Sequence, residues 1–166
     1  DPAPAAPAEA AAATPTPAPL AKPRLIHYND ARHYSLYRYD PPMSMHQLQR
    51  PIDEILGTSV DMLSYGLASG STFLHGSEKF RRWGEGGDPH NSGVMWWRAA
   101  KNLEEALARG MDPLAIVVAR GREKGIKVIC SLRMNDATGP ADSNRYMVNP
   151  LKDEKPELMI GGDDPT

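Results

Sequence analysis

Apolar positions follow two different spacings along residues 24–132, one typical of strands and one typical of helices. In chain order the pattern predicts a strand, a helix, a second strand, two helices and a third strand. The predicted ranges are 24–29, 44–57, 59–67, 95–109, 113–124 and 126–132. Strands that alternate with helices pair in parallel and are joined by helical crossovers, so the pattern predicts an α/β fold.

The helix boundaries are marked by residues that satisfy free backbone groups. Ser44, with Gln47 three positions later, forms a capping box that opens the first helix. Asp112 is suited to cap the third helix, and Pro113 suits its first position because proline has no N–H group to leave unpaired. Gly125 is expected to end that helix in a left-handed conformation.

The third predicted strand is apolar almost throughout, from Ile126 to Leu132. This pattern is typical of a parallel strand that is covered on both faces. Cys130, the one cysteine of the chain, lies inside this strand, so we expect a packed and unreactive thiol. A single cysteine also excludes a disulfide bond within the chain.

Residues 1–19 consist almost wholly of alanine, proline and threonine. Such a segment buries too little apolar surface to offset the entropy of ordering it, so residues 1–23 are predicted to be a disordered Ala/Pro-rich linker. Residues 24–166 then form the folded part. A tether of this composition favours a secreted or cell-envelope protein whose signal peptide is not in this chain, although a linker inside a longer protein has the same composition.

The charge pattern narrows the set of partners. The chain carries 19 basic and 21 acidic residues, a net charge of −2, and no basic stripe interleaved with aromatic residues, so a nucleic-acid partner is not expected. No apolar run approaches the roughly 20 residues that span a bilayer. The five histidines lack metal-ligand spacing, and no glycine-rich turn joins a strand to a helix. We therefore expect no metal and no cofactor.

Polar residues directly follow the first and third predicted strands. Asn29 and Asp30 come after the first strand, and Arg133, Asn135 and Asp136 come after the third. Ligands of α/β proteins bind at the carboxyl ends of the strands, so these five residues are predicted to bind substrate or to shape its site. For the two carboxylates an alternative stays open, in which Asp30 caps a turn and Asp136 pairs with Arg133.

Aromatic residues offer a second hint of ligand chemistry. Trp83 lies in a long polar loop over residues 68–93, which by its length is functional or disordered. An indole face in such a loop can stack on a sugar ring. The alternative is that the Trp83 indole packs in the core.

Several segments resemble a known family. They are Asn29-Asp30, Gly57-Thr58-Ser59-Val60-Asp61, Asp112-Pro113-Leu114, Lys124-Gly125-Ile126-Lys127-Val128 and Arg133-Met134-Asn135-Asp136. Together they are similar to the bacterial glycosyl hydrolase-like family 10 proteins, which are TIM barrels related to glycoside hydrolases. The similarity covers roughly residues 24–136, and the chain departs from it at Gly121-Arg122, where many members carry Ala-His.

The resemblance implies an incomplete (β/α)8 TIM barrel, represented by its first three strand-helix units. It also implies an exported protein that acts on a polysaccharide or oligosaccharide by acid/base hydrolysis with paired carboxylates, the main ones beyond residue 166. The residues present would then be inactive alone. Two other interpretations stay open: a non-catalytic carbohydrate- or cell-wall-binding α/β module, and a small flavodoxin-like domain.

Overall fold

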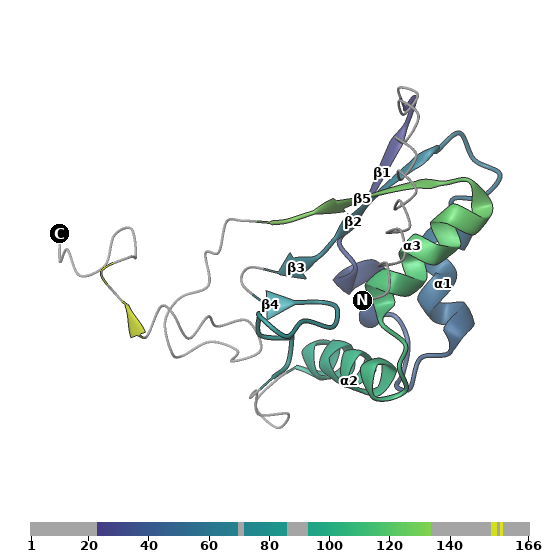
Figure 1. The fold of residues 1–166 in the computed structure, drawn as a ribbon. Helices are drawn as coiled ribbons and strands as arrows, with labels where there is room; N and C mark the ends of the chain where they lie inside the picture. Colours follow the sequence, from purple (N-terminus) through teal and green to yellow (C-terminus); the bar gives the residue numbers. More distant parts are fainter. Residues whose placement is uncertain (1–22, 70–71, 86–92, 134–153, 156, 158–166) are drawn as a thin grey trace, which may run out of the picture.

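The computed structural model describes residues 23–69, 72–85, 93–133, 154–155 and 157. Its central element is a sheet of three parallel strands in the order β1 (Ile26–Asn29), β2 (Met62–Gly66) and β5 (Lys127–Ser131) (Figure 1). The three strands predicted from the sequence are thus neighbours in chain order, and the α/β class is confirmed. The predicted linker lies outside the described residues except for Pro23.

The two faces of this sheet differ in how far they are covered. Leu63 of β2 and Val128 of β5 are register partners; Leu63 is fully buried and Val128 packs against the core. The next row along the strands is Tyr28, Ser64 and Ile129, whose side chains point to the opposite face because side chains alternate along a strand. On that face Tyr28 is 50% exposed and Ile129 is 40% exposed.

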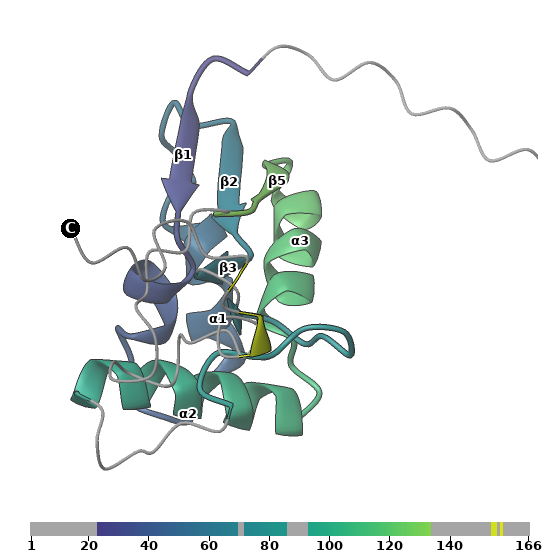
Figure 2. The same cartoon turned by 90° about the vertical axis from the view of Figure 1, so that its left-hand side faces the viewer.

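The expectation that the third strand is covered on both faces is therefore wrong for β5. Cys130 in this strand is exposed, so the expectation of a packed thiol is wrong as well. The reason is position: β5 is an edge strand that pairs only with β2 within the described residues, and Figure 2 shows it at the side of the sheet away from β1. An apolar run identifies a strand, but it does not identify what covers each face.

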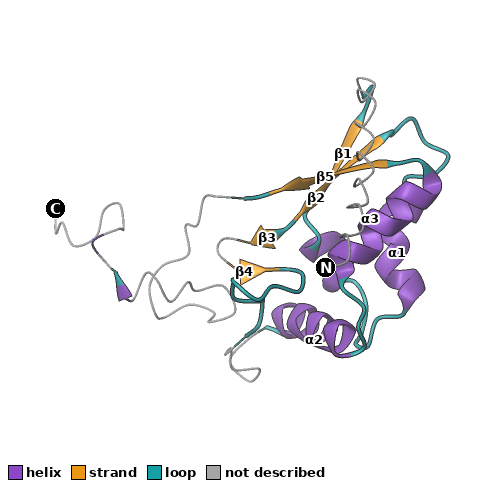
Figure 3. Cartoon of the chain, in the orientation of Figure 1, coloured by secondary structure: helices purple, strands orange, loops and turns teal. Residues whose placement is uncertain are grey.

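Two helices cover the face of the sheet that carries Leu63 and Val128. The chain passes from β1 to β2 through α1 (Met45–Asp53) and reaches β5 through α3 (Pro113–Lys124), and these two helices contact one another (Figure 3). A further helix, α2 (Val94–Ala108), precedes α3 and packs on a single turn of π-helix, η1 (Arg32–Leu36). In the part of the chain that the structure describes, no helix is long and apolar enough to cross a membrane.

The capping residues act as the sequence predicts. Ser44 Oγ accepts a hydrogen bond from Gln47 N at 3.3 Å, while Gln47 Oε1 accepts one from Ser44 N at 2.8 Å, which completes the capping box of α1. Asp112 caps α3, and Gly125 closes that helix at φ 72°. These caps fix the residues at which α1 and α3 begin.

The segment predicted as a long loop, 68–93, contains regular structure in its described part. It starts with a short antiparallel pair, β3 (Ala68–Ser69) and β4 (Thr72–Phe73). The chain then returns past β4, where Trp83 N donates to the Phe73 carbonyl oxygen at 2.8 Å. Leu74 N donates to the carbonyl oxygen of Leu67, directly after β2, at 2.9 Å, so the described part of this loop lies against the carboxyl end of β2.

Candidate functional site

The carboxyl end of β1 is a tight turn built by Asn29. Its side chain is 1% exposed, and Asn29 Oδ1 accepts a hydrogen bond from Ala31 N at 2.8 Å. A short polar side chain that bonds the backbone two residues on is a common means of starting a turn. Asn29 consequently shapes the candidate site, but its amide is not exposed to a ligand as the sequence-based interpretation also allowed.

The turn after β1 is held in an unusual backbone conformation. Ala31 has φ 60°, which places a non-glycine residue in the left-handed region, and its side chain is fully buried. Gly66 at the end of β2 lies against the backbone of Asp30. A Cβ on residue 66 would come within 3.0–3.1 Å of Asp30 backbone atoms. A π-helical turn, η1, follows at once. Strained backbone and π-helical turns both concentrate at functional sites in proteins.

Asp30 makes two hydrogen bonds to a single neighbour, His33. Its Oδ1 accepts from His33 N at 2.8 Å, and its Oδ2 contacts His33 Nδ1. The side chain of Asp30 is 20% exposed and that of His33 is 49% exposed, so the pair lies at the surface of the carboxyl edge. The alternative in which Asp30 caps a turn is therefore confirmed. The same geometry also brings a carboxylate and an imidazole together, which the sequence analysis did not foresee.

Arg32, which is buried, connects to this pair through Tyr37, whose ring contacts both Arg32 and His33. The Arg32 guanidinium carbon is 5.1 Å from the ring centroids of both Trp83 and Trp96, and 5.6 Å from that of Tyr37. These four side chains, called the Arg32 cluster below, join η1, the segment after β4 and α2. Burial raises the pKa of the Tyr37 phenol above its ordinary value of 10; the charge of Arg32 acts in the opposite direction and that of Asp30 in the same one.

Trp83 therefore has a packing role in this structure. Its side chain is 2% exposed and stacks on Trp96 with the ring centroids 5.2 Å apart. The prediction that Trp83 offers a face to a sugar ring is not supported, and the core-packing alternative is the one observed. The packing partners are Trp96, which stacks on Trp83, and Arg32, whose guanidinium lies within cation–π distance of both indole rings.

The third strand contributes less to the described site than the sequence predicts. Arg133, two residues beyond β5, is exposed. Asn135 and Asp136 lie outside the described residues, so the predicted Arg133–Asp136 ion pair stays a prediction. In register, Ser131 at the end of β5 pairs with Gly66, which itself lies against Asp30. The carboxyl ends of all three strands thus meet at one edge of the sheet.

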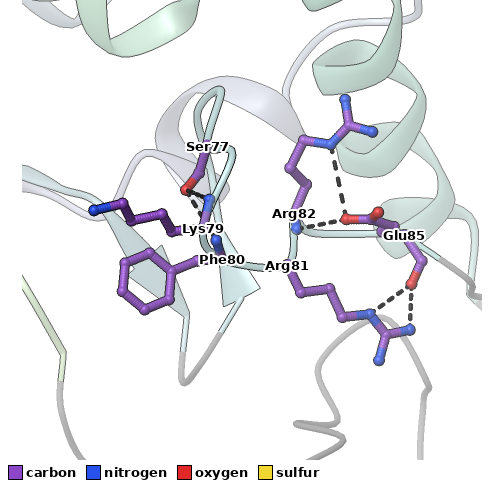
Figure 4. A network of polar contacts seen from close by, with 6 residues as sticks. All are labelled: Ser77, Lys79, Phe80, Arg81, Arg82 and Glu85. Carbon is purple, nitrogen blue, oxygen red and sulfur yellow. Dashed lines mark hydrogen bonds and ion pairs between the residues drawn. The ribbon is translucent and has the colours of Figure 1, made fainter.

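A separate hollow of about 240 Å³ lies between α2 and the segment after β4. Figure 4 shows the polar contacts that hold this segment: Ser77 Oγ accepts from Lys79 N and Phe80 N, and the Arg81 side chain donates to the Glu85 carbonyl oxygen. The Glu85 carboxylate in turn accepts from the backbone N–H of Arg82 at 2.9 Å. Of the predicted strand-end residues that the structure describes, Asn29, Asp30 and Arg133, none lines this hollow.

Comparison with known protein families gives no match for this chain, and comparison with curated proteins gives none either. The resemblance to glycosyl hydrolase-like proteins therefore stays an interpretation of the sequence. Among the described residues, no three histidine, cysteine, aspartate or glutamate side chains are grouped as metal ligands would be. The residues that the structure brings together at the strand ends are Asn29, Asp30 and His33.

Proposed function

We propose that this chain is the N-terminal part of an exported glycosyl hydrolase-like protein with a (β/α)8 fold that acts on polysaccharide. The observation that carries the proposal is the order β1-β2-β5, in which three parallel strands follow one another with connecting helices on one face. A (β/α)8 barrel begins in this way, because right-handed crossovers between sequential neighbours put every helix on the same side. A flavodoxin-like sheet instead has β1 between β2 and the next parallel strand, which does not agree with this order.

Two further features support a barrel over a dinucleotide-binding sheet. A Rossmann-type half has the same sequential order, but its first strand leads into a glycine-rich phosphate-binding turn. Here the first turn reads Asn29-Asp30-Ala31 and holds no glycine. In addition, the face away from α1 and α3 is apolar at Ile26 and Tyr28, which are about half exposed. In a closed barrel this face becomes the packed interior.

The described residues alone fit a non-catalytic carbohydrate-binding module better than a hydrolase, because they supply one strand-end carboxylate. Glycoside hydrolysis needs two carboxyl groups about 5–9.5 Å apart. Among the described strand ends, Asp30 is the one acidic side chain, and both of its oxygens are directed to His33. Asp136, the other carboxylate predicted at a strand end, lies outside the described residues. Without a second carboxylate, the same edge would serve a non-catalytic carbohydrate-binding module.

Affinity electrophoresis of the chain in gels that contain xyloglucan, mixed-linkage β-glucan, mannan or pectin tests the proposal. At least one polysaccharide is expected to retard the wild-type chain. Asp30→Asn is expected to raise the dissociation constant for that polysaccharide about tenfold. Asp61→Asn is the matched control, because Asp61 precedes β2 at the opposite end of the sheet. Retention by none of the four polysaccharides, or equal retention of the wild type and Asp30→Asn, would contradict the proposal.

A further inference from the structure

The Asp30–His33 pair fixes both the orientation and the protonation pattern of an imidazole ring. A carboxylate only accepts hydrogen bonds, so a neutral His33 ring bonded to Asp30 Oδ2 carries its proton on Nδ1. The other ring nitrogen, Nε2, then has a free lone pair. In the part of the chain that the structure describes, the ring makes no other hydrogen bond, and 49% of the side chain is exposed.

The surroundings of the ring keep it in place. The His33 ring packs edge-on against Tyr37 with the centroids 5.1 Å apart, and Tyr37 belongs to the Arg32 cluster. On the other side, Asp30 is held by the close backbone contact with Gly66 and by its bond to the His33 N–H group. The imidazole is therefore held by its contact with the Tyr37 ring and by the bond at Nδ1, while Nε2 has no hydrogen-bond partner among the described residues.

We propose that His33 is the residue of this edge that contacts the ligand, accepting a hydrogen bond from a ligand hydroxyl at Nε2, and that Asp30 is a positioning residue that acts through His33. The ligand chemistry rests on the proposed function, since a saccharide supplies the hydroxyl. The hydroxyl keeps its proton and donates a hydrogen bond to the Nε2 lone pair, so no covalent bond is made or broken in this contact. The Asp30 carboxylate holds the ring in the Nδ1–H form, which leaves Nε2 as the acceptor.

The substitution Asp30→Asn separates positioning from simple packing. The asparagine Oδ1 can still accept from His33 N, but its NH2 group then faces His33 Nδ1 and donates to it. The ring is forced into the Nε2–H form, which no longer accepts a hydrogen bond at Nε2. A purely structural role for Asp30 predicts no change in the tautomer of His33.

Nitrogen-15 NMR of the full chain, labelled at histidine and recorded at a pH where the rings are neutral, reads this tautomer directly. His75 is an internal reference, because its Nδ1 lies 2.7 Å from the Gly76 carbonyl oxygen, which can only accept. The wild-type His33 is expected to match His75 and to switch to the Nε2–H form in Asp30→Asn, while His75 does not change. A His33 ring in the Nε2–H form in the wild type would overturn the proposal.

The ligand step is tested with the polysaccharide that retards the chain most strongly. His33→Gln is expected to weaken its binding at least tenfold, whereas His46→Gln, an exposed control on α1, should leave binding unchanged. Equal binding by His33→Gln and the wild type would overturn this inference and leave the proposed function standing. A wild-type chain that holds the expected tautomer but binds none of the polysaccharides would overturn the proposed function, and the hydroxyl contact with it.

Discussion

Replacing Gly121 with alanine is expected to destabilise the fold, because α3 lies very close to β5 at this point. A Cβ on residue 121 would lie 2.5 Å from Val128 Cγ2 and 2.9 Å from the Ile126 carbonyl oxygen. Ile126 is held in place by its own N–H group, which donates to the Gly121 carbonyl oxygen at 2.9 Å. The added methyl group therefore meets a backbone atom that has little freedom to move aside.

The expected loss is the difference between two opposing effects. Overpacking of a buried position costs about 1–3 kcal/mol, and a clash with backbone belongs in the upper half of that range. Alanine is a better helix former than glycine by about 1 kcal/mol, which offsets part of the cost. The net loss in the free energy of unfolding is then about 1–2 kcal/mol.

Urea unfolding of the full chain, followed by far-ultraviolet circular dichroism, measures this loss. Ala119→Gly is the matched control: it lies two residues earlier in α3, is exposed, and reports the helix-propensity difference alone. The steric reasoning is refuted if Gly121→Ala stabilises the chain by as much as Ala119→Gly destabilises it. The double variant adds a second check, since Val128→Ala should cost less when residue 121 is alanine.

Two further predictions concern carboxylates that hold the fold. Asp112→Ala should lower the free energy of unfolding by about 2–3 kcal/mol, since Oδ1 caps α3 while Oδ2 accepts from Gly76 N; Asp112→Asn should lose less, and equal losses would contradict this account. The backbone N–H groups of Arg24 and Leu25 hold the pKa of Asp61 below its ordinary value of 3.8. The Asp61 carboxylate stabilises the fold above pH 3.8, and this contribution is lost as the pH falls through the lower folded pKa. Asp61→Asn should therefore flatten the pH dependence of the free energy of unfolding in that acid range and in no other.

Local rules predicted the parts of the fold that depend on neighbouring residues. The capping box at Ser44 and the cap at Asp112 involve groups within three residues, so the sequence alone determines them. The parallel pairing of the strands followed from the alternation with helices, because a parallel connection needs a crossover. The order of the strands agrees with the same rule that sequential elements lie side by side.

Other parts depended on contacts between distant residues. The exposure of Cys130 follows from β5 being an edge of the described sheet, and no pattern within the strand encodes this. The short pair β3–β4 consists of two residues on each side, too few for an alternating pattern to show. Trp83 packs against Arg32, which lies 51 positions earlier in the chain, so the loop composition around Trp83 does not predict its burial.

The pairing of Asp30 with His33 depends on both the local sequence and the tertiary structure. An aspartate three residues before a histidine can bond both the backbone and the ring of that histidine when the chain turns between them. The turn itself follows from the strand end at Asn29. What the sequence does not show is that Ala31 takes a left-handed conformation, because alanine rarely adopts it. That conformation needs Asn29 to bond Ala31 N and the fold to bury Ala31, so the geometry of the pair depends on the tertiary structure around it.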